Sequence, residues 1–491
     1  EKEDYVQAVE HVNSSYDGDL KGRESVSTGD GEARMTTAKW LACIALALAY
    51  TTAFQQGSLL GSIVKSIDED LGPTTYYNWM VSANTIATAI ALPLTGGLSD
   101  IFGRRWFLIS GNMFSLLGAI VSLAGQNTPT LIAGSAITGL GGGAQQMALA
   151  AVAELVPNKH RGTVQACLDL AILPWTLLGA LIGGGIVTGG GAVGWRIVFI
   201  MGVALNLLAL VMAFFWYYPP GIEQKMAGRS KAQAIGSLDW MGVFLFATGL
   251  LLVLVALSVG GTIYAWDSAG FIAMFIVGVA SLVGLGFWES FAAKNPFMPG
   301  RLFKGKTRTY TMVLIITFVS GMGLYAAAAF WTQLCRGMWG AGLIRTGVYS
   351  IPGGVGGVGA EVPPEISANT GQVGGFAAGM LIGKTPYFKT NWCLLYGCIF
   401  KVAADGAMTS LTPDTVTRGL GLSFLSMIGT GWISVSLIVC VQLACDDADI
   451  GLATLLLGSI RAVGGSVAIT IYSTILNNKL QNDAPLHVAQ A

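Results

Sequence analysis

Long apolar runs separated by short polar stretches fill most of this chain of 491 residues. A helix needs about 20 mostly apolar residues to cross a bilayer. The runs fall at 40–64, 77–98, 106–125, 130–153, 165–188, 195–217, 239–260, 268–289, 309–331, 391–410, 419–443 and 450–475, with a broken run at 343–383. Only 11% of the residues are charged and the net charge is zero, whereas soluble domains carry about 25% charged residues. The pattern predicts an all-α, polytopic bundle of membrane helices and excludes a disordered chain, a soluble multidomain enzyme and a nucleic-acid binder.

Basic residues gather in every second loop between these runs. The loops after the second, fourth, sixth and eighth runs contain Arg104 and Arg105, then Lys159 and Arg161, then Lys225, Arg229 and Lys231, and finally Lys294, Arg301, Lys304, Lys306 and Arg308. The alternate loops at 127–129 and 262–268 contain no basic residue. Since short loops rich in Lys and Arg stay in the cytosol, the even-numbered loops and the N-terminus are predicted to be cytosolic.

The domain organisation follows from the same runs. Residues 1–37 are polar and acidic, and we expect them to form a disordered cytosolic tail. The remaining chain divides into an N-terminal half at 38–218, two linking helices with a cytosolic loop at 219–308, a C-terminal half at 309–478 and a tail at 479–491.

The broken run contains a polar segment, 358–370, that includes Glu361, Glu365 and the pair Pro363 and Pro364. Carboxylates and unsatisfied backbone groups are costly inside lipid. Without this segment, the flanking stretches join into one Gly-rich span of workable length. We interpret 358–370 as an insertion, and a genuine re-entrant loop is the alternative.

The loop after the second run contains a motif that ends one helix, turns at a glycine and begins the next helix with two arginines. An acidic residue here can pair with Arg and dock on a neighbouring helix end. Such a pair can hold one conformation and release in another. The loop resembles the signature of the major facilitator superfamily, which is matched by Gly96, Leu98, Asp100, Gly103, Arg104 and Arg105. The resemblance implies two six-helix halves and a conformational latch at these residues.

The fifth run resembles the antiporter signature of the same superfamily, although small residues also serve plain helix packing. Gly179, Gly183 and Gly184 match the signature, while Ala180 stands where the superfamily has Pro. In the fourth run, Ser135 stands where antiporters often carry an Arg implicated in proton coupling. The resemblance therefore favours export but does not support coupling through that position.

The pair of runs at 239–260 and 268–289 separates the two halves. It indicates a member of the major facilitator superfamily with fourteen spans rather than twelve. The stretches 238–242, 260–266, 449–453 and 458–465 resemble the fungal trichothecene efflux pump family, which is also similar to fungal siderophore transporters. The resemblance covers about 38–480 and fades across 334–390. It implies proton-coupled efflux of hydrophobic toxins or drugs by alternating access. It also implies one further span after a long loop, and because the tail at 479–491 is polar we expect that final span to be missing.

Ionisable residues inside spans are functional candidates by default. The proton-coupling candidates are Asp169, Glu154 and Asp405, and the intramembrane charges are Lys401 and Arg461. Lys401 and Asp405 are four residues apart on one helix face, so they can neutralise each other. Adaptable amides and a flat ring suit a cavity for weakly polar compounds, and the cavity candidates are Gln55, Gln56, Trp175 and Gln333.

The resemblance implies a monomer in the lipid bilayer, with a small hydrophobic substrate and protons as partners and no cofactor. The plasma membrane is the expected location, with a vacuole or vesicle as the alternative. Only three His occur, and neither a catalytic arrangement nor a metal site is expected. Two other functions stay open: siderophore–iron transport by proton symport, and a non-transporting paralogue that acts as a sensor or scaffold.

Overall fold

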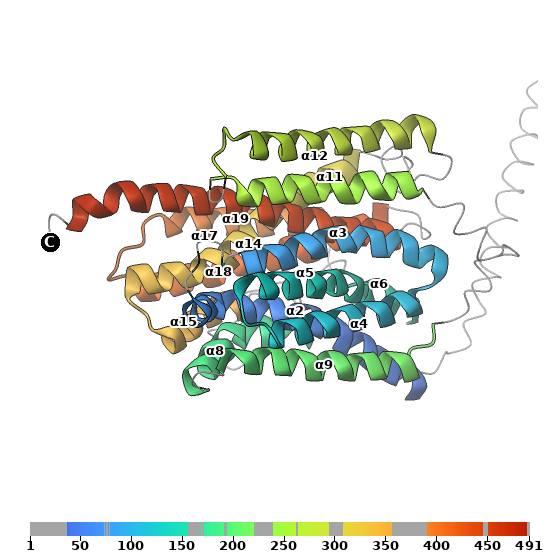
Figure 1. Cartoon of the computed structure of the whole chain (residues 1–491), viewed down its shortest axis with the longest axis horizontal. Coiled ribbons are helices and arrows are strands. Elements are labelled where there is room, and N and C mark those ends of the chain that lie inside the picture. The colour runs from blue at the N-terminus through green and yellow to red at the C-terminus, as the bar shows by residue number, and fades with distance from the viewer. Residues whose placement is uncertain are drawn as a thin grey trace, which may run out of the picture. The chain divides into compact units, whose positions relative to one another are not determined.

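A computed structural model of the chain describes residues 37–72, 74, 77, 79–155, 168, 171–190, 194–219, 239–261, 264–293, 308–355, 390–444 and 450–488. In these ranges the regular structure is helical, and Gly260 and Tyr264 form an isolated β-bridge in a turn (Figure 1).

The N-terminal half contains helices that match the first six runs. They are α2 (Thr37–Leu71), α3 (Trp79–Phe102), α4 (Arg104–Leu123), α5 (Thr128–Gln145), α6 (Ala148–Leu155), α8 (Leu173–Gly189) and α9 (Gly194–Trp216). The fourth run is divided, because the chain turns at Gln146 and Met147 between α5 and α6. Asn127 begins α5 by accepting a hydrogen bond from the backbone N–H of Thr130 at 2.9 Å, the usual role of an N-cap.

The two linking runs form an antiparallel pair, α11 (Trp240–Val259) and α12 (Ala269–Phe287), followed by the π-helical turn η4 (Trp288–Ala292). Asp239 caps α11 by accepting from the N–H of Gly242 at 2.8 Å. Its carboxylate also accepts from the indole N–H of Trp288 at 2.7 Å. A single carboxylate thus begins one helix of the pair and ties it to the end of the other.

The C-terminal half contains α14 (Arg308–Trp339), α15 (Leu343–Val355), α17 (Thr390–Met408), α18 (Val416–Ala444) and α19 (Ile450–Val488). The broken run begins as α15, and the segment 358–370 lies outside the described residues. The last helix continues to Val488 and so includes much of the stretch 479–491 that we expected to form a tail.

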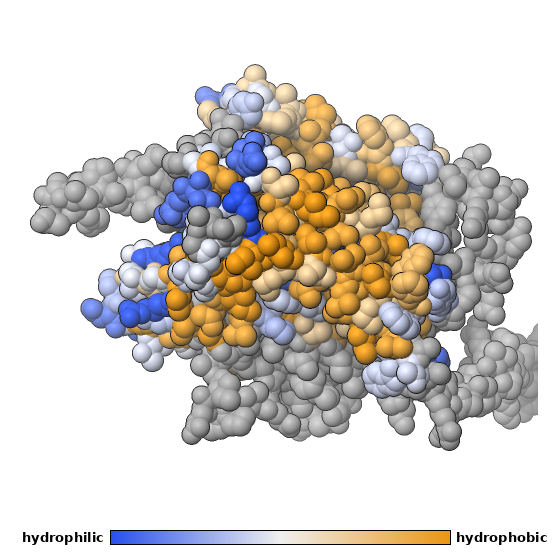
Figure 2. All heavy atoms as spheres, turned by 60° about the horizontal axis from the view of Figure 1, so that its bottom comes forward, coloured by the Kyte–Doolittle hydropathy of each residue, from blue (hydrophilic) through white to orange (hydrophobic). Residues whose placement is uncertain are grey.

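The outer surface of these helices is apolar. Eight helices in the described ranges are long and apolar enough to cross a membrane. Large side chains such as Phe244, Ile276 and Phe291 are exposed on them, and one face of the molecule shows a broad hydrophobic area (Figure 2). Exposed apolar patches of this extent suit lipid rather than water, as expected for a polytopic membrane protein.

Among the described residues, three apolar cores hold the helices together. One joins α2, α3, α5 and α9 around Leu59, Ile63 and Phe199. A second joins α14, α18 and α19 around Leu437 and Leu456. A third joins the linking pair to both halves, with members on α3, α11, α12 and α19: Ile86, Ala89, Ile90, Phe246, Leu250, Leu254, Leu285 and Ala462.

Candidate functional site

The motif between α3 and α4 contains a turn that only glycine adopts readily. Gly103 has a φ of 93°, a conformation that other residues rarely take. Its N–H donates to the carbonyl of Ser99 at 2.8 Å, so α3 closes immediately before α4 begins at Arg104. The motif glycine therefore sets the sharp reversal that places both arginines at the start of α4.

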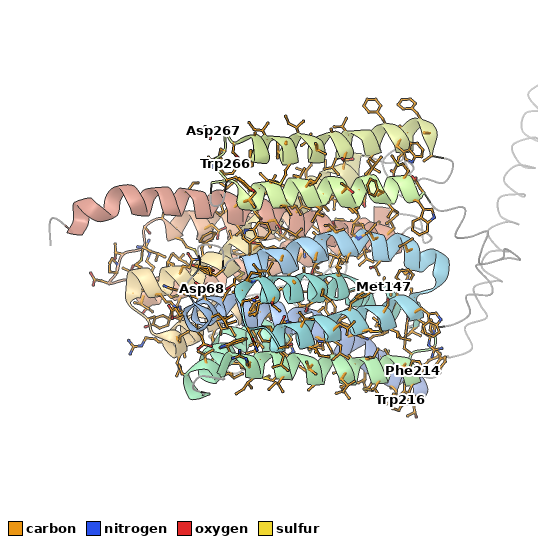
Figure 3. The ribbon with its side chains drawn as sticks, in the orientation of Figure 1. Asp68, Met147, Phe214, Trp216, Trp266 and Asp267 are labelled. Carbon is orange, nitrogen blue, oxygen red and sulfur yellow. The ribbon has the colours of Figure 1, made fainter. Side chains whose placement is uncertain are left out.

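Arg105 joins the start of α4 to the end of α9. Its guanidinium donates to the carbonyl of Phe214 at 2.9 Å and stacks over the ring of Tyr218 at 3.7 Å. Phe214 and Trp216 mark this end of α9 in Figure 3. A cation here satisfies a terminal carbonyl and opposes the negative end of the helix dipole. Arg105 thus docks the start of α4 on the end of α9 and Arg104 is buried, while the expected pairing through Asp100 concerns a side chain outside the described ones.

Gly96, the first residue of the motif, lies where α3 meets α19 of the other half. A Cβ at Gly96 would lie 3.0 Å from Leu455 Cδ1. Further along the same two helices, the hydroxyl of Ser459 donates to the carbonyl of Ala89 at 2.6 Å. Between these two contacts, Gly458 of α19 faces Leu92 of α3, where an added Cβ would lie 3.4 Å from Leu92 Cδ1. We call these residues of α3 (89–96) and α19 (452–459) the α3–α19 seam.

A second close approach joins the halves through α8 and α15. A Cβ at Gly347 of α15 would lie 2.6 Å from the Cα of Leu181, and a Cβ at Gly184 of α8 would lie 3.2 Å from the carbonyl oxygen of Leu343. Small residues allow such backbone contact between helices. We call residues 181–184 and 343–347 the α8–α15 seam.

The glycines of the antiporter-like motif in α8 divide between two neighbours. Gly179 and Gly183 face α2 of the same half, where added Cβ atoms would lie 3.2 Å from Ser58 Cβ and 2.7 Å from Ser62 Oγ. Gly184 faces α15 of the other half. The motif therefore packs α8 within its half and also forms part of the α8–α15 seam.

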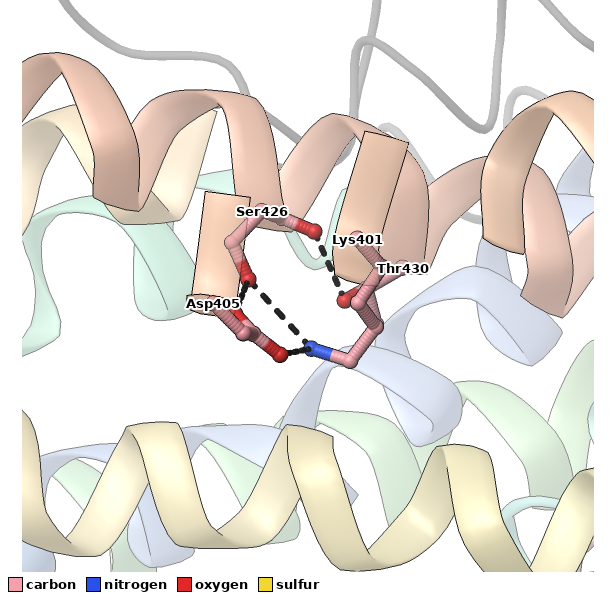
Figure 4. A network of polar contacts seen from close by, with 4 residues as sticks. All are labelled: Lys401, Asp405, Ser426 and Thr430. Carbon is pink, nitrogen blue, oxygen red and sulfur yellow. Dashed lines mark hydrogen bonds and ion pairs between the residues drawn. The ribbon is translucent and has the colours of Figure 1, made fainter. Parts of the chain in front are cut away.

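Lys401 and Asp405 lie together on α17. Lys401 Nζ is 3.1 Å from Asp405 Oδ2 and donates to Ser426 Oγ of α18 at 3.3 Å. The Ser426 hydroxyl in turn donates to the other oxygen of Asp405 (Figure 4). The Lys401 side chain is only 11% exposed whereas that of Asp405 is 45% exposed. The arrangement is a buried cation neutralised by a carboxylate that is open on one side.

A buried amide network that was not predicted from the sequence joins α4, α5 and α9. Gln145 Nε2 donates to Asn112 Oδ1 and to Asn206 Oδ1, both at 2.8 Å. The Ser115 hydroxyl donates to Gln145 Oε1 at 3.1 Å. All four side chains are at most 1% exposed. In the sequence the signal is an amide inside an apolar run, the same feature that made Gln55 and Gln56 candidates.

The comparisons with known proteins settle the family. A family model described as "Fungal trichothecene efflux pump (TRI12)" matches residues 32–491. The chain belongs to the fungal trichothecene efflux pump family. The match confirms the predicted family. It also confirms the interpretation of the chain as a membrane transporter of the efflux type.

Individual relatives have low sequence identity to this chain, but the similarity covers most of both chains. It is 26% identical to "Multidrug transporter protein MdtP" of Bacillus subtilis over 87% of this chain and 73% of that protein. It is 24% identical to "Trichothecene efflux pump TRI12" of Fusarium sporotrichioides over 88% of this chain and 70% of the relative. It is 25% identical to "Efflux pump FUS6" of Gibberella moniliformis over 91% and 75% of the two chains.

Solved structures confirm the fold. The crystal structure of a D-xylose-proton symporter superposes with a TM-score of 0.56 at 16% identity, covering 89% of this chain and 90% of that one. A bacterial homologue of the human lysosomal transporter Spinster gives 0.57 at 13% identity, covering 91% and 85%. The predicted all-α major facilitator fold is therefore confirmed, and both family and fold are those of transporters.

The remaining candidates in this efflux-family chain are dispersed. Trp175 is partly buried beside the core of the N-terminal half, and Gln333 is exposed on α14. Gln55 and Gln56 are enclosed on α2, and Arg461 is partly buried on α19. Two proton-coupling candidates lie outside what is described, Asp169 as a residue and Glu154 as a side chain. Among the described residues, no group of three or more His, Cys, Asp or Glu could hold a metal ion.

Proposed function

We propose that the chain exports small hydrophobic compounds across a membrane in exchange for protons, by alternating access between its two halves. The observation that carries the proposal is the pair of seams. Both join residues 38–218 to residues 309–478 at glycines that bring two helices close together, and parting of one seam while the other stays closed is the movement that alternating access needs.

The two seams lie at opposite ends of the helices. Gly96 is near the end of α3, beside the loop whose Arg104 and Arg105 indicate the cytosol. By the same alternation, α8 ends outside, and Gly184 lies near that end. With the N-terminus in the cytosol, opening the α3–α19 seam admits a substrate from inside. Opening the α8–α15 seam then releases it outside.

The substrate class follows from the relatives and from the low charge of the spans. Relatives are named as trichothecene and multidrug pumps, and both names fit weakly polar compounds. Trp175 and Gln333 are the candidate contacts whose side chains are not fully enclosed. The plasma membrane is the proposed location, because expulsion from the cell requires it.

Asp405 is the proposed proton acceptor among the described side chains. It is partly exposed near the end of α17, which the loop charges place outside, and it neutralises the buried Lys401. Protonation removes that neutralisation and weakens the contact with Ser426 of α18. Proton entry at Asp405 thus changes how α17 and α18 hold each other, which links the gradient to helix movement.

A transport assay with a defined direction tests this function. Inside-out vesicles from yeast that produces the chain should accumulate a radiolabelled trichothecene when their lumen is acidified, and an uncoupler should abolish the uptake. Asp405→Asn should reduce this uptake at least about tenfold, the scale of one lost ionic interaction of about 1.4 kcal/mol, while downhill exchange of the toxin continues. Ser410→Ala on the exposed turn after α17 is the matched control.

The same assay can refute each part separately. If Asp405→Asn leaves gradient-driven uptake intact, Asp405 does not take part in proton coupling, while the proposed export function still stands. Movement of a ferric siderophore into intact cells, without toxin export, would replace efflux by the siderophore function. A chain that inserts correctly yet carries neither compound would support the non-transporting alternative.

A further inference from the structure

The side chain of Lys401 extends from α17 to α14. A Cβ at Gly323 of α14 would lie 2.6 Å from Cε and 3.0 Å from Nζ of Lys401. The same nitrogen is 3.1 Å from Asp405 Oδ2 and donates to Ser426 Oγ of α18 at 3.3 Å (Figure 4). The ammonium therefore lies where three helices meet, and the end of its side chain packs on α14 at a position that has no side chain.

Backbone contacts hold α14 and α17 in place on either side of this lysine. Gly321 and Gly323 are two residues apart, about 200° around a helix, so they face nearly opposite sides of α14. A Cβ at Gly321 would lie 2.9 Å from the Cα of Arg461 on α19, so α14 cannot retreat from α17 without pressing into α19. A Cβ at Gly429 of α18 would lie 2.6 Å from the backbone nitrogen of Lys401, so α17 is held directly against α18.

The end of the lysine side chain is the part that would yield to a methyl group at residue 323. Nonbonded carbon atoms rest about 3.5–4.0 Å apart, so Cε of Lys401 would move by about 1 Å. The four-carbon stem of Lys is flexible, whereas both helices are held by backbone contacts. The ammonium contacts of 3.1 Å and 3.3 Å are already long for hydrogen bonds. We therefore expect a displaced ammonium to keep at most one of them.

We propose that Gly323 is a positioning residue through which α14 holds the Lys401 ammonium between Asp405 and Ser426. This role rests on the proposed function, in which protonation of Asp405 removes the neutralisation of Lys401. Once the ammonium has left Asp405, a proton that arrives there no longer changes the contact between α17 and α18. Because α14 also meets α19, a joint shift of these two helices relative to α17 acts on the ammonium directly. Gly323 thus connects the proton site to the helix that forms one side of the α3–α19 seam.

Gly323→Ala should separate proton coupling from the movement of substrate. In the vesicle assay, we expect acid-driven uptake of the radiolabelled trichothecene to fall about tenfold, the scale of one lost charged hydrogen bond, while downhill exchange of the toxin continues unchanged. Gly337→Ala on the same helix is the matched control, because nothing lies within 4 Å of its added Cβ. Gly321→Ala is the structural comparison: its methyl group meets the backbone of α19, so it should reduce uptake and exchange together.

A second measurement tests whether the effect of Gly323→Ala passes through Lys401. In the full chain in lipid nanodiscs, Gly323→Ala should lower the unfolding temperature by about 2 °C relative to Gly337→Ala. Lys401→Ala combined with Asp405→Asn removes the ion pair without leaving a lone charge. In that background the methyl group enters the space left by the lysine, and the decrease should disappear. A decrease of the same size in both backgrounds would show that the methyl group acts on the helix backbone and would overturn the proposal.

The positioning role and the proton site fail in different ways. If Asp405→Asn abolishes acid-driven uptake but Gly323→Ala behaves like Gly337→Ala, the proton site stands and Gly323 has no positioning role. If Asp405→Asn leaves uptake intact, the proton site is wrong, and the coupling role of Gly323 is wrong with it. Equal loss of uptake and exchange in Gly323→Ala would make Gly323 a packing position only. These comparisons use single substitutions, so they decide the matter even if the chain without the ion pair does not fold.

Discussion

One added methyl group at the α8–α15 seam tests whether closure of this seam belongs to the transport cycle. Gly347→Ala places Cβ 2.6 Å from the Cα and 2.9 Å from the N of Leu181. Nonbonded carbon atoms rest about 3.5–4.0 Å apart, so the helices must separate by about 1 Å. Both clashing atoms are backbone and cannot rotate away. Overpacking of this kind costs about 1–3 kcal/mol, which shifts an equilibrium by about 5–150-fold.

The shift is measurable as chemical accessibility. A cysteine introduced at the half-buried Leu181, in a chain whose native cysteines are replaced, should react faster with a membrane-impermeant maleimide when the seam is open. Gly347→Ala should raise the fraction that reacts at short times and lower the rate of toxin export, because the closed state becomes rare. Binding of the toxin to the resting protein should change less than the export rate.

Two neighbouring glycines calibrate this result. Gly184→Ala should have a smaller effect, because its Cβ would lie 3.2 Å from the Leu343 carbonyl oxygen, and Gly185→Ala should have none, because its Cβ meets nothing within 4 Å. If Gly347→Ala leaves accessibility and export equal to those of Gly185→Ala, the reasoning about this seam is wrong.

Two further substitutions test stability. Gly103→Ala forces a side chain into a φ of 93° at a cost of about 1–2 kcal/mol, so thermal unfolding should begin earlier than in Gly185→Ala; an unchanged transition would contradict the role of the turn. Gln145→Leu leaves Asn112 and Asn206 without their shared donor, and losing a buried partner costs about 1–3 kcal/mol. The same unfolding assay should show a decrease that disappears when both Asn residues are also replaced by Leu.

The helices could be predicted from the sequence because their cause is local. Each apolar run of about 20 residues has one stable form in lipid, and the described helices follow the runs closely. The turn at Gly103 could also be predicted, because a glycine between the end of one helix and two arginines that begin the next is typical of a tight turn. Motif and composition together were enough to predict the family correctly.

Contacts between distant segments could not be predicted in the same way. Ser459 and Ala89 meet across two halves of the chain, and neither residue type indicates a partner. The amides of Gln145 and Asn206 come from different runs and meet only because α5 and α9 pack on α4. Apolar periodicity shows that a helix is buried, but not which neighbour each polar side chain faces.

The position of the linking helix α11 has a consequence for the speed of the pump. Phe246, Leu250 and Leu254 of α11 pack in one core with residues of both α3 and α19. When α3 and α19 part, this apolar side of α11 must shift against at least one of them. In the proposed transport cycle, we therefore expect these α11 side chains to resist the parting of α3 and α19, so that substitutions in the linker change the rate of turnover.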